Sequence, residues 1–379
     1  MRMGTWYWLN VGTPELWPED FARIREAGCH YVAMGYGCDQ TELARRTDQT
    51  RRALDAAAEA GLGAYLLFWS VGIMGIEANP DFVPVQADGQ AARRRCNVFH
   101  PGWRRERLLP YVTAVAETYG NHPALLGFYV DDAFGCYGDY LYGYSRHERA
   151  AFRDWLKERY RSVGHLNGVW GTGHRDWEDI DLPRGVMPNV AAWMDFTAAR
   201  GQWLDEWARE LTGAMRTAAP RARLVLGESA GGVLRAPAGC GADWPALAAH
   251  FDTFMIYLTY DFEQLKPDDW RAVVRRTVET GRRIAASREL IVCSWVTHPE
   301  RFTPMPREVL EATVAEAAEG GADAFEYYAW RTADWRHLPP PPYVNLPNWP
   351  VYLADQGELR EAVSQINHRL CGNRPGTGA

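Results

Sequence analysis

Two adjacent carboxylates, Asp131 and Asp132, directly follow an apolar stretch at residues 125–130. Like charges this close raise the pKa of at least one carboxyl group, which suits a general acid. A helix N-cap or a salt bridge to an arginine would explain the same pair structurally. Because residues that follow the strands of an α/β barrel point into its mouth, we favour the catalytic interpretation.

Two glutamates are further candidates for acid–base chemistry. Glu228 follows an apolar stretch at residues 223–227, and Glu326 lies within the aromatic stretch at residues 325–328. If Glu326 is buried, its pKa is raised and it is either reactive or tightly paired. The sequence leaves open whether Glu326 faces the interior of a barrel or the surrounding helices.

The chain contains 17 Trp and 18 Tyr, more than packing alone requires. Aromatic rings with polar tips can hold a ligand such as a sugar, although a large aromatic core would use the same residues. The candidate ligand-binding residues lie in or just after the predicted strands. They are Trp69, Tyr129, Tyr257, Tyr260, Asp261, Trp295, His298, Trp330 and Arg331.

The sequence offers no pattern for a metal or a cofactor. No H-E-x-x-H, P-loop or G-x-G-x-x-G motif follows a predicted strand. The seven cysteines are scattered and never form a C-x-x-C pair, which fits reduced thiols in a cytoplasmic protein. Cys293 has no Cys-His-Asn order around it, so we interpret it as a packed thiol.

The net charge of −7 and the pI near 5.8 argue against a nucleic-acid partner, whose binding surface would be basic. No apolar stretch approaches the roughly 20 residues that span a bilayer, and the first residues contain no apolar region of the kind found in secretory leaders. We therefore expect a cytoplasmic protein with a small-molecule ligand and without a membrane partner. A homo-oligomer is compatible with the sequence.

Short apolar stretches alternate with amphipathic ones, which predicts repeated βα units around a parallel sheet. The predicted fold is a single α/β domain, a (β/α)8 barrel over residues 1–372 followed by a disordered tail at 373–379. Predicted helices include 41–60, 106–119 and 357–370, with a long helical insertion after strand four at 146–218, interrupted around 171–188. The predicted strands are 5–10, 30–35, 64–70, 125–130, 223–227, 253–258, 290–293 and 324–328.

Four stretches together resemble glycoside hydrolase family 42, the β-galactosidase-like barrels. They are HPALLGFYVDDAFG at 122–135, AFRDWLKERY with HLNGVWG at 151–171, WEDIDLPR at 177–184, and AEGGADAFEYYAWR at 318–331. The resemblance covers about residues 95–335 and implies a (β/α)8 barrel with a carbohydrate-like ligand at its mouth.

The chain departs from the family pattern where that family keeps its catalytic pair. The resemblance places Asp132 at the acid/base position and Asp131 at the position of an asparagine that holds a sugar hydroxyl. Cys293-Ser294-Trp295 stand where the family has its nucleophilic glutamate. The family's cysteine cluster after strand four is reduced to Cys136, so we expect no zinc.

Three functions remain open. The first is a hydrolase with a changed, inverting mechanism, in which Asp132 is the acid and Glu326 or Glu228 the base. Inverting pairs stand about 6.5–9.5 Å apart, which different strand ends can supply. The second is a pseudo-glycosidase repurposed for epimerisation or isomerisation of a small molecule. The third is a carbohydrate-binding protein without catalysis.

Overall fold

Eight parallel strands close into one barrel, in which each strand pairs with its neighbours in chain order and β8 pairs with β1. The computed structural model describes residues 1–9, 14–36, 42–69, 79–91, 97–131, 142–258, 267–296, 304–331, 353–354 and 356–372. The strands are β1 (Arg2–Trp8), β2 (Tyr31–Gly35), β3 (Gly63–Trp69), β4 (Leu125–Asp131), β5 (Arg223–Ser229), β6 (Thr253–Leu258), β7 (Glu289–Trp295) and β8 (Ala324–Arg331).

The predicted fold class is confirmed, and all eight predicted strands are present. β1 begins three residues before the predicted stretch at 5–10, while β7 and β8 extend beyond the predicted carboxyl ends. These strands are apolar on both faces because the interior and the surrounding helices bury them from both sides. The predicted tail at 373–379 lies outside the described residues.

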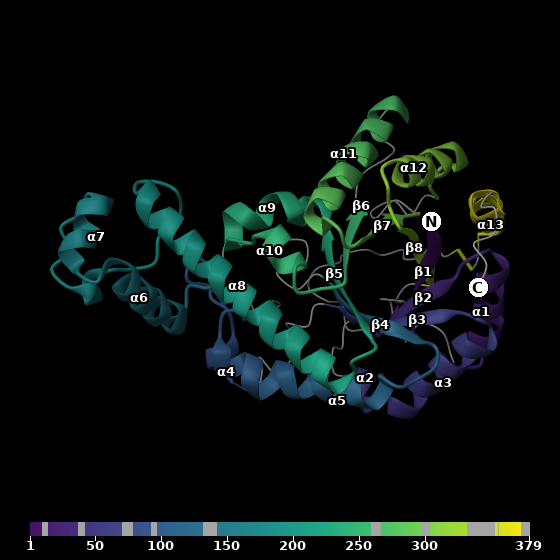
Figure 1. The fold of residues 1–379 in the computed structure, drawn as a ribbon, viewed down its shortest axis with the longest axis horizontal. Coiled ribbons are helices and arrows are strands. Elements are labelled where there is room, and N and C mark those ends of the chain that lie inside the picture. Colours follow the sequence, from purple (N-terminus) through teal and green to yellow (C-terminus); the bar gives the residue numbers. More distant parts are fainter. Residues whose placement is uncertain are drawn as a thin grey trace.

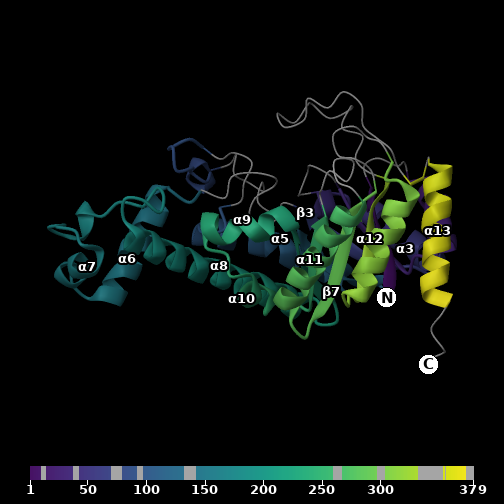
Figure 2. The same ribbon diagram turned by 90° about the horizontal axis from the view of Figure 1, so that it is seen from above.

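Helices surround the barrel, and α11, α12 and α13 follow one another along one side of it (Figure 2). The predicted helix 41–60 is interrupted at Arg46, whose φ of −104° and ψ of 45° are not helical. Among the described residues, no helix is long and apolar enough to cross a bilayer. The helices of this layer are α1 (Trp17–Glu26), α2 (Glu42–Arg45), α3 (Thr47–Glu59), α4 (Pro101–Trp103), α5 (Leu109–Tyr119), α9 (Ala230–Cys240), α10 (Trp244–Ala248), α11 (Pro267–Ala285), α12 (Arg307–Glu319) and α13 (Gly357–Gly372). Short helical turns lie at Pro80–Phe82, at Arg104–Leu108 and, against α6, at Trp177–Asp179.

The predicted insertion after β4 is also present. It consists of α6 (Arg146–Tyr160), α7 (Val163–Trp170) and the long α8 (Val190–Ala218). Figure 1 shows α8 running from the barrel to α6 and α7 at its far end. Asp195 on α8 joins these helices, since it accepts hydrogen bonds from the hydroxyl of Tyr160 at 2.5 Å and the indole of Trp170 at 2.8 Å.

Two apolar cores result from the alternation of side chains along the strands. One lies between the strands and the helices, and includes Phe128, Leu226 and Ile256. The other fills the barrel interior and includes Trp6 and Tyr129. The face to which a strand residue belongs therefore decides whether it can reach the mouth of the barrel.

Candidate functional site

A buried carboxylate, Glu326, lies among the aromatic side chains inside the barrel. Its Oε2 accepts a hydrogen bond from the indole of Trp6 at 2.6 Å. Its Oε1 accepts from the hydroxyl of Tyr31 at 2.8 Å and from that of Tyr129. All of these side chains are buried. The structure thus places Glu326 on the interior face of β8. The sequence alone left open whether it faces the interior or the helices.

The surroundings of Glu326 act on its pKa in opposite directions. Burial is the largest cause and raises the pKa, whereas the hydrogen bonds from Tyr129, Trp6 and Tyr31 lower it, as does the charge of Arg2. The net effect is a raised pKa. The pKa values of Tyr31 and Tyr129 are also raised, by burial and then by the charge of Glu326. Three donors hold the two oxygens of Glu326 in a defined orientation.

An aromatic group lies closer to the carboxyl ends of the strands. The indole of Trp8 donates to the hydroxyl of Tyr328 at 3.1 Å. Trp295 stacks on Tyr328 with 5.0 Å between ring centroids, and Trp6 approaches the same ring at 5.3 Å. Of the predicted ligand-binding residues, Trp295 belongs to this group, and Tyr129 and Tyr257 face the interior below it.

Several residues of the interior were not among the sequence candidates, namely Trp6, Trp8, Tyr31, Tyr65 and Tyr328. A signal for two of them was present in the sequence. Trp6 and Trp8 are two residues apart in Thr5-Trp6-Tyr7-Trp8, and alternation in a strand puts them on the same face. Their contacts with Glu326 and Tyr328 could not be predicted, because β1 and β8 are separated by most of the chain.

The aspartate pair lies only partly within the described residues. Asp131 ends β4, and its backbone is in register with Trp69 of β3 and Gly227 of β5. Both Asp131 and Trp69 therefore occupy carboxyl ends of strands, the rim where barrel sites are built. The candidates Asp132, Tyr260, Asp261 and His298 lie outside the described residues.

Glu228 is not brought to the interior. Leu226 of the same strand packs in the outer core, and Glu228, two residues later, is in register with Ile256, which also packs there. The carboxylate of Glu228 accepts from the backbone and the hydroxyl of Ser229, at 2.8 and 3.1 Å. Strand alternation thus separates Glu228 from Glu326, so the two do not form a pair across the mouth.

Trp330 and Arg331 are likewise directed to α1 rather than to the barrel interior. The guanidinium of Arg331 pairs with the buried carboxylate of Asp20, with 2.9 Å from Nη2 to Oδ1. The indole of Trp330 lies 3.4 Å from the same carboxylate, and the hydroxyl of Tyr7 donates to it at 2.7 Å. These contacts attach α1 to β1 and β8, and the assignment of Trp330 and Arg331 to ligand binding stays a prediction.

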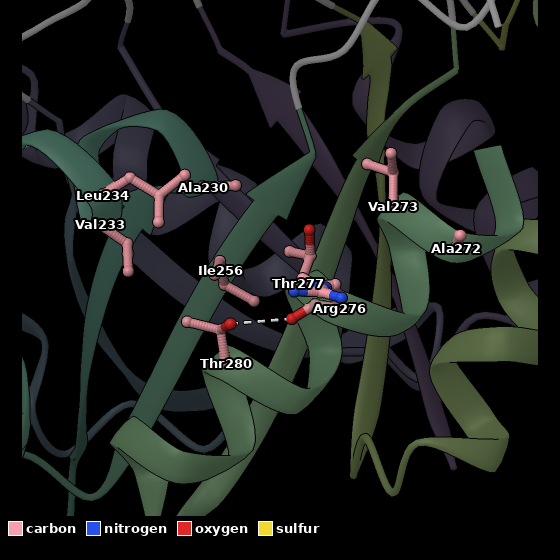
Figure 3. Close-up of a pocket in the computed structure, with 9 residues that line it drawn as sticks. All are labelled: Ala230, Val233, Leu234, Ile256, Ala272, Val273, Arg276, Thr277 and Thr280. Carbon is pink, nitrogen blue, oxygen red and sulfur yellow. Dashed lines mark hydrogen bonds between the residues drawn. The ribbon is translucent and has the colours of Figure 1, made fainter. Parts of the chain in front are cut away.

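A cleft on the outside of the barrel, of about 370 Å³, lies between α9, β6 and α11. Figure 3 shows Leu234 and Val233 of α9 on one side and Val273 and Thr277 of α11 on the other. Its lining is mainly apolar and contains no carboxylate. It offers no acid–base chemistry and lies apart from the interior aromatic residues.

No group of three or more His, Cys, Asp or Glu side chains within the described ranges is arranged to hold a metal ion. Cys96 and Cys136 lie outside those ranges. The metal prediction for this region therefore stays a prediction.

Comparison with known proteins decides the family. The family 42 model, described as β-galactosidase, matches residues 73–335, more than half of the chain. The chain belongs to glycoside hydrolase family 42. A β-galactosidase from an Arthrobacter species is 26% identical over 355 residues, covering 84% of this chain and 48% of that protein. One from Thermus thermophilus is 30% identical over 215 residues, covering 51% and 32%.

Solved structures agree on the fold of this family 42 chain. The β-galactosidase from Marinomonas ef1 superposes with a TM-score of 0.78 at 19% identity, covering 98% of this chain and 60% of that one. The family 42 enzyme Gan42B gives a TM-score of 0.78 at 15% identity, covering 99% and 58%. The chain spans about half the length of the curated relatives it matches.

Proposed function

We propose that this family 42 barrel acts on a sugar or another polyhydroxylated small molecule at the carboxyl ends of its strands, with Asp132 as the general acid. The observation that carries the proposal is the aromatic group of Trp8, Trp295 and Tyr328 in a family 42 barrel. This group lies toward the carboxyl ends of the strands, where barrel enzymes build their sites. Indole and phenol rings offer apolar faces with polar tips, which suits the faces and hydroxyls of a sugar.

The proposed chemistry is acid–base. The proposed acid is Asp132, which would give its proton to a leaving oxygen, with the adjacent carboxylate of Asp131 favouring the protonated form. Of the two proposed bases, Glu326 faces the interior and Glu228 does not. Glu326 is therefore the candidate base, and the hydrogen bonds that it accepts from Trp6, Tyr31 and Tyr129 fix its position.

A second candidate function is epimerisation or isomerisation, and β7 favours it. Between residues 290 and 296, where the resemblance places the family's nucleophile, the chain carries no carboxylate. Glu289 begins the strand at the opposite end of the barrel and pairs with Arg223. A retaining glycosidase needs two carboxyl groups about 5 Å apart, so proton transfer without hydrolysis is the alternative to an inverting hydrolase.

The test combines one variant with product analysis. Asp132→Asn keeps the shape and hydrogen bonding of the side chain but removes its transferable proton. We expect turnover to fall by a factor of about 10² or more while ligand binding, followed by tryptophan fluorescence, is retained. Asp154→Asn, on exposed α6, is the matched control and should leave turnover unchanged. An Asp132→Asn variant as active as the wild type would show that another residue is the acid.

The products distinguish the two candidate functions. The relatives are named β-galactosidases, so aryl β-galactosides are the first substrates to test. A hydrolase releases a free sugar and incorporates oxygen from labelled water. An epimerase or isomerase leaves the mass unchanged in ordinary water and exchanges a carbon-bound proton in deuterated buffer. Saturable sugar binding without either product would support the binding-protein interpretation.

A further inference from the structure

A second cleft, of about 490 Å³, lies at the amino ends of the strands, opposite the proposed mouth. Four arginines line it: Arg2 of β1, Arg223 of β5, Arg282 of α11, and Arg288 just before β7. Its only acidic lining residues are Glu289 and Asp323. The charged side chains of the lining therefore leave a net charge of +2, in a chain whose overall charge is −7.

The carboxylate of Glu289 is fully engaged. Its Oε1 pairs with Arg2, and its Oε2 pairs with Arg223 at 2.5 Å and accepts from the hydroxyl of Thr253 at 3.2 Å. Only 10% of the Glu289 side chain is exposed, against 37% for Arg2 and 41% for Arg223. Two half-exposed guanidinium groups thus share one largely buried carboxylate, so these three side chains together carry one net positive charge at the cleft.

The other two arginines are held mostly by backbone carbonyls. Arg288 donates to the carbonyls of Phe251 and Ala249, at 3.0 Å each. Arg282 donates to Asp323 at 2.7 Å and to the carbonyls of Arg288 and Gly321. Carbonyls at helix ends carry only a partial negative charge, so they orient a guanidinium without neutralising it.

We propose that this cleft is a binding site for a small oxyanion, either inorganic phosphate or the phosphate group of a phosphorylated small molecule. Guanidinium groups present several donors in a rigid fork that matches phosphate oxygens. Two of the arginines begin strands, and Arg282 of α11 and Arg288 of the turn before β7 are held by backbone carbonyls, so the site is already formed. It is separate from the proposed function and does not depend on it.

Arg223 is the residue to change, because Arg2 also lies over the ring of Tyr31, 5.7 Å from its centroid, and would disturb the Glu326 network. Binding of inorganic phosphate to the wild type is measured by titration calorimetry, with ionic strength held constant by chloride. We expect saturable binding with one phosphate per chain. Arg223→Gln should weaken it at least about tenfold, and Arg223→Lys, which keeps the charge but not the fork, less than that.

The control is Arg149→Gln. Arg149 lies on distant α6, has a similar exposure and is paired to Asp181. It should bind phosphate as the wild type does. If the Arg223 variants unfold, Arg288→Gln tests the same cleft. Absence of saturable phosphate binding to the wild type, equal affinity in the Arg223 variants, or equal binding of chloride would overturn the proposal.

A hexose phosphate titration identifies the source of the oxyanion. Affinity well above that of inorganic phosphate indicates a phosphorylated small molecule, and equal affinity indicates the free anion. Both results support an oxyanion site. Asp132→Asn should leave either affinity unchanged, which separates this site from the mouth of the barrel.

Discussion

At the scale of single residues, Glu326 is the group whose surroundings most decide its role. A carboxylate in an apolar interior is costly unless it is hydrogen-bonded. Trp6, Tyr31 and Tyr129 supply three donors, and Arg2, over the ring of Tyr31, supplies a positive charge. The cost of burial still exceeds these contributions, since the pKa of Glu326 is raised.

This raised pKa predicts a pH dependence of stability. A group whose pKa is higher in the folded state than in the unfolded state stabilises the fold at low pH, and this contribution is lost as pH rises through the folded pKa. Glu326→Gln has no such group. The unfolding free energy of the wild type minus that of Glu326→Gln should therefore decrease as pH rises above the ordinary glutamate value, by at most about 1.4 kcal/mol per pH unit.

Urea unfolding of both proteins from pH 4 upward measures this difference. A difference that grows with pH would mean that the folded carboxylate is ionised with a lowered pKa. Glu326→Leu is the companion variant. It leaves the indole of Trp6 and two tyrosine hydroxyls without their acceptor. The unfolding free energy should fall by about 1–3 kcal/mol for each buried donor that stays unpaired, at any pH where the barrel folds.

At the scale of the elements, the close approach of β4 and β5 depends on one glycine. A Cβ atom on Gly127 would lie 1.9 Å from the carbonyl oxygen of Arg223, a backbone atom that cannot turn away. The two strands are hydrogen-bonded neighbours at this point. The absence of a side chain at residue 127 therefore permits the register that places Asp131 beside Gly227.

Gly127→Ala should destabilise the protein by about 1–3 kcal/mol, because an overpacked site shifts its backbone. Gly168→Ala is the matched control, since it lies on an exposed part of α7 and a Cβ there meets nothing within 4 Å. Alanine suits a helix better than glycine, so this control should be neutral or more stable by about 0.5–1 kcal/mol. Urea midpoints compare the two, and equal effects would contradict the proposed clash.

At the scale of the whole molecule, the closed barrel and the α6–α7 extension differ in how they are held. Each strand is hydrogen-bonded on both sides, and helices cover the barrel. The extension lies at the far end of α8 (Figure 1) and is attached largely through α8, where Asp195 binds Tyr160 and Trp170. Regions with fewer buried contacts open at lower free energy than the core.

Hydrogen exchange should therefore be faster in α6 and α7 than in β4 to β7. Asp195→Ala removes the acceptor shared by Tyr160 and Trp170. It should accelerate exchange further in α6 and α7 while leaving the barrel strands unchanged, as followed by mass spectrometry of peptides. Equal protection of the extension and the strands would show that the molecule opens only as one unit.

The sequence by itself determined the elements and their order. Apolar stretches mark the eight strands, because strands buried on both faces must be apolar. The interruption of the insertion between α7 and α8 and the final helix α13 also follow from local composition. The motif at residues 122–135 indicates family 42 from the sequence alone, and the apolar stretch within it locates Asp131 at the carboxyl end of β4.

Only the tertiary structure decided which side chains meet. The face of Glu326, the separation of Glu228 from it, and the pairing of Arg331 with Asp20 depend on strand parity and register. A one-residue change in parity exchanges the interior for the helix layer, and local composition does not determine parity when both layers are apolar. The arginine cleft joins residues 2, 223, 282 and 288, which are neighbours only because the barrel closes.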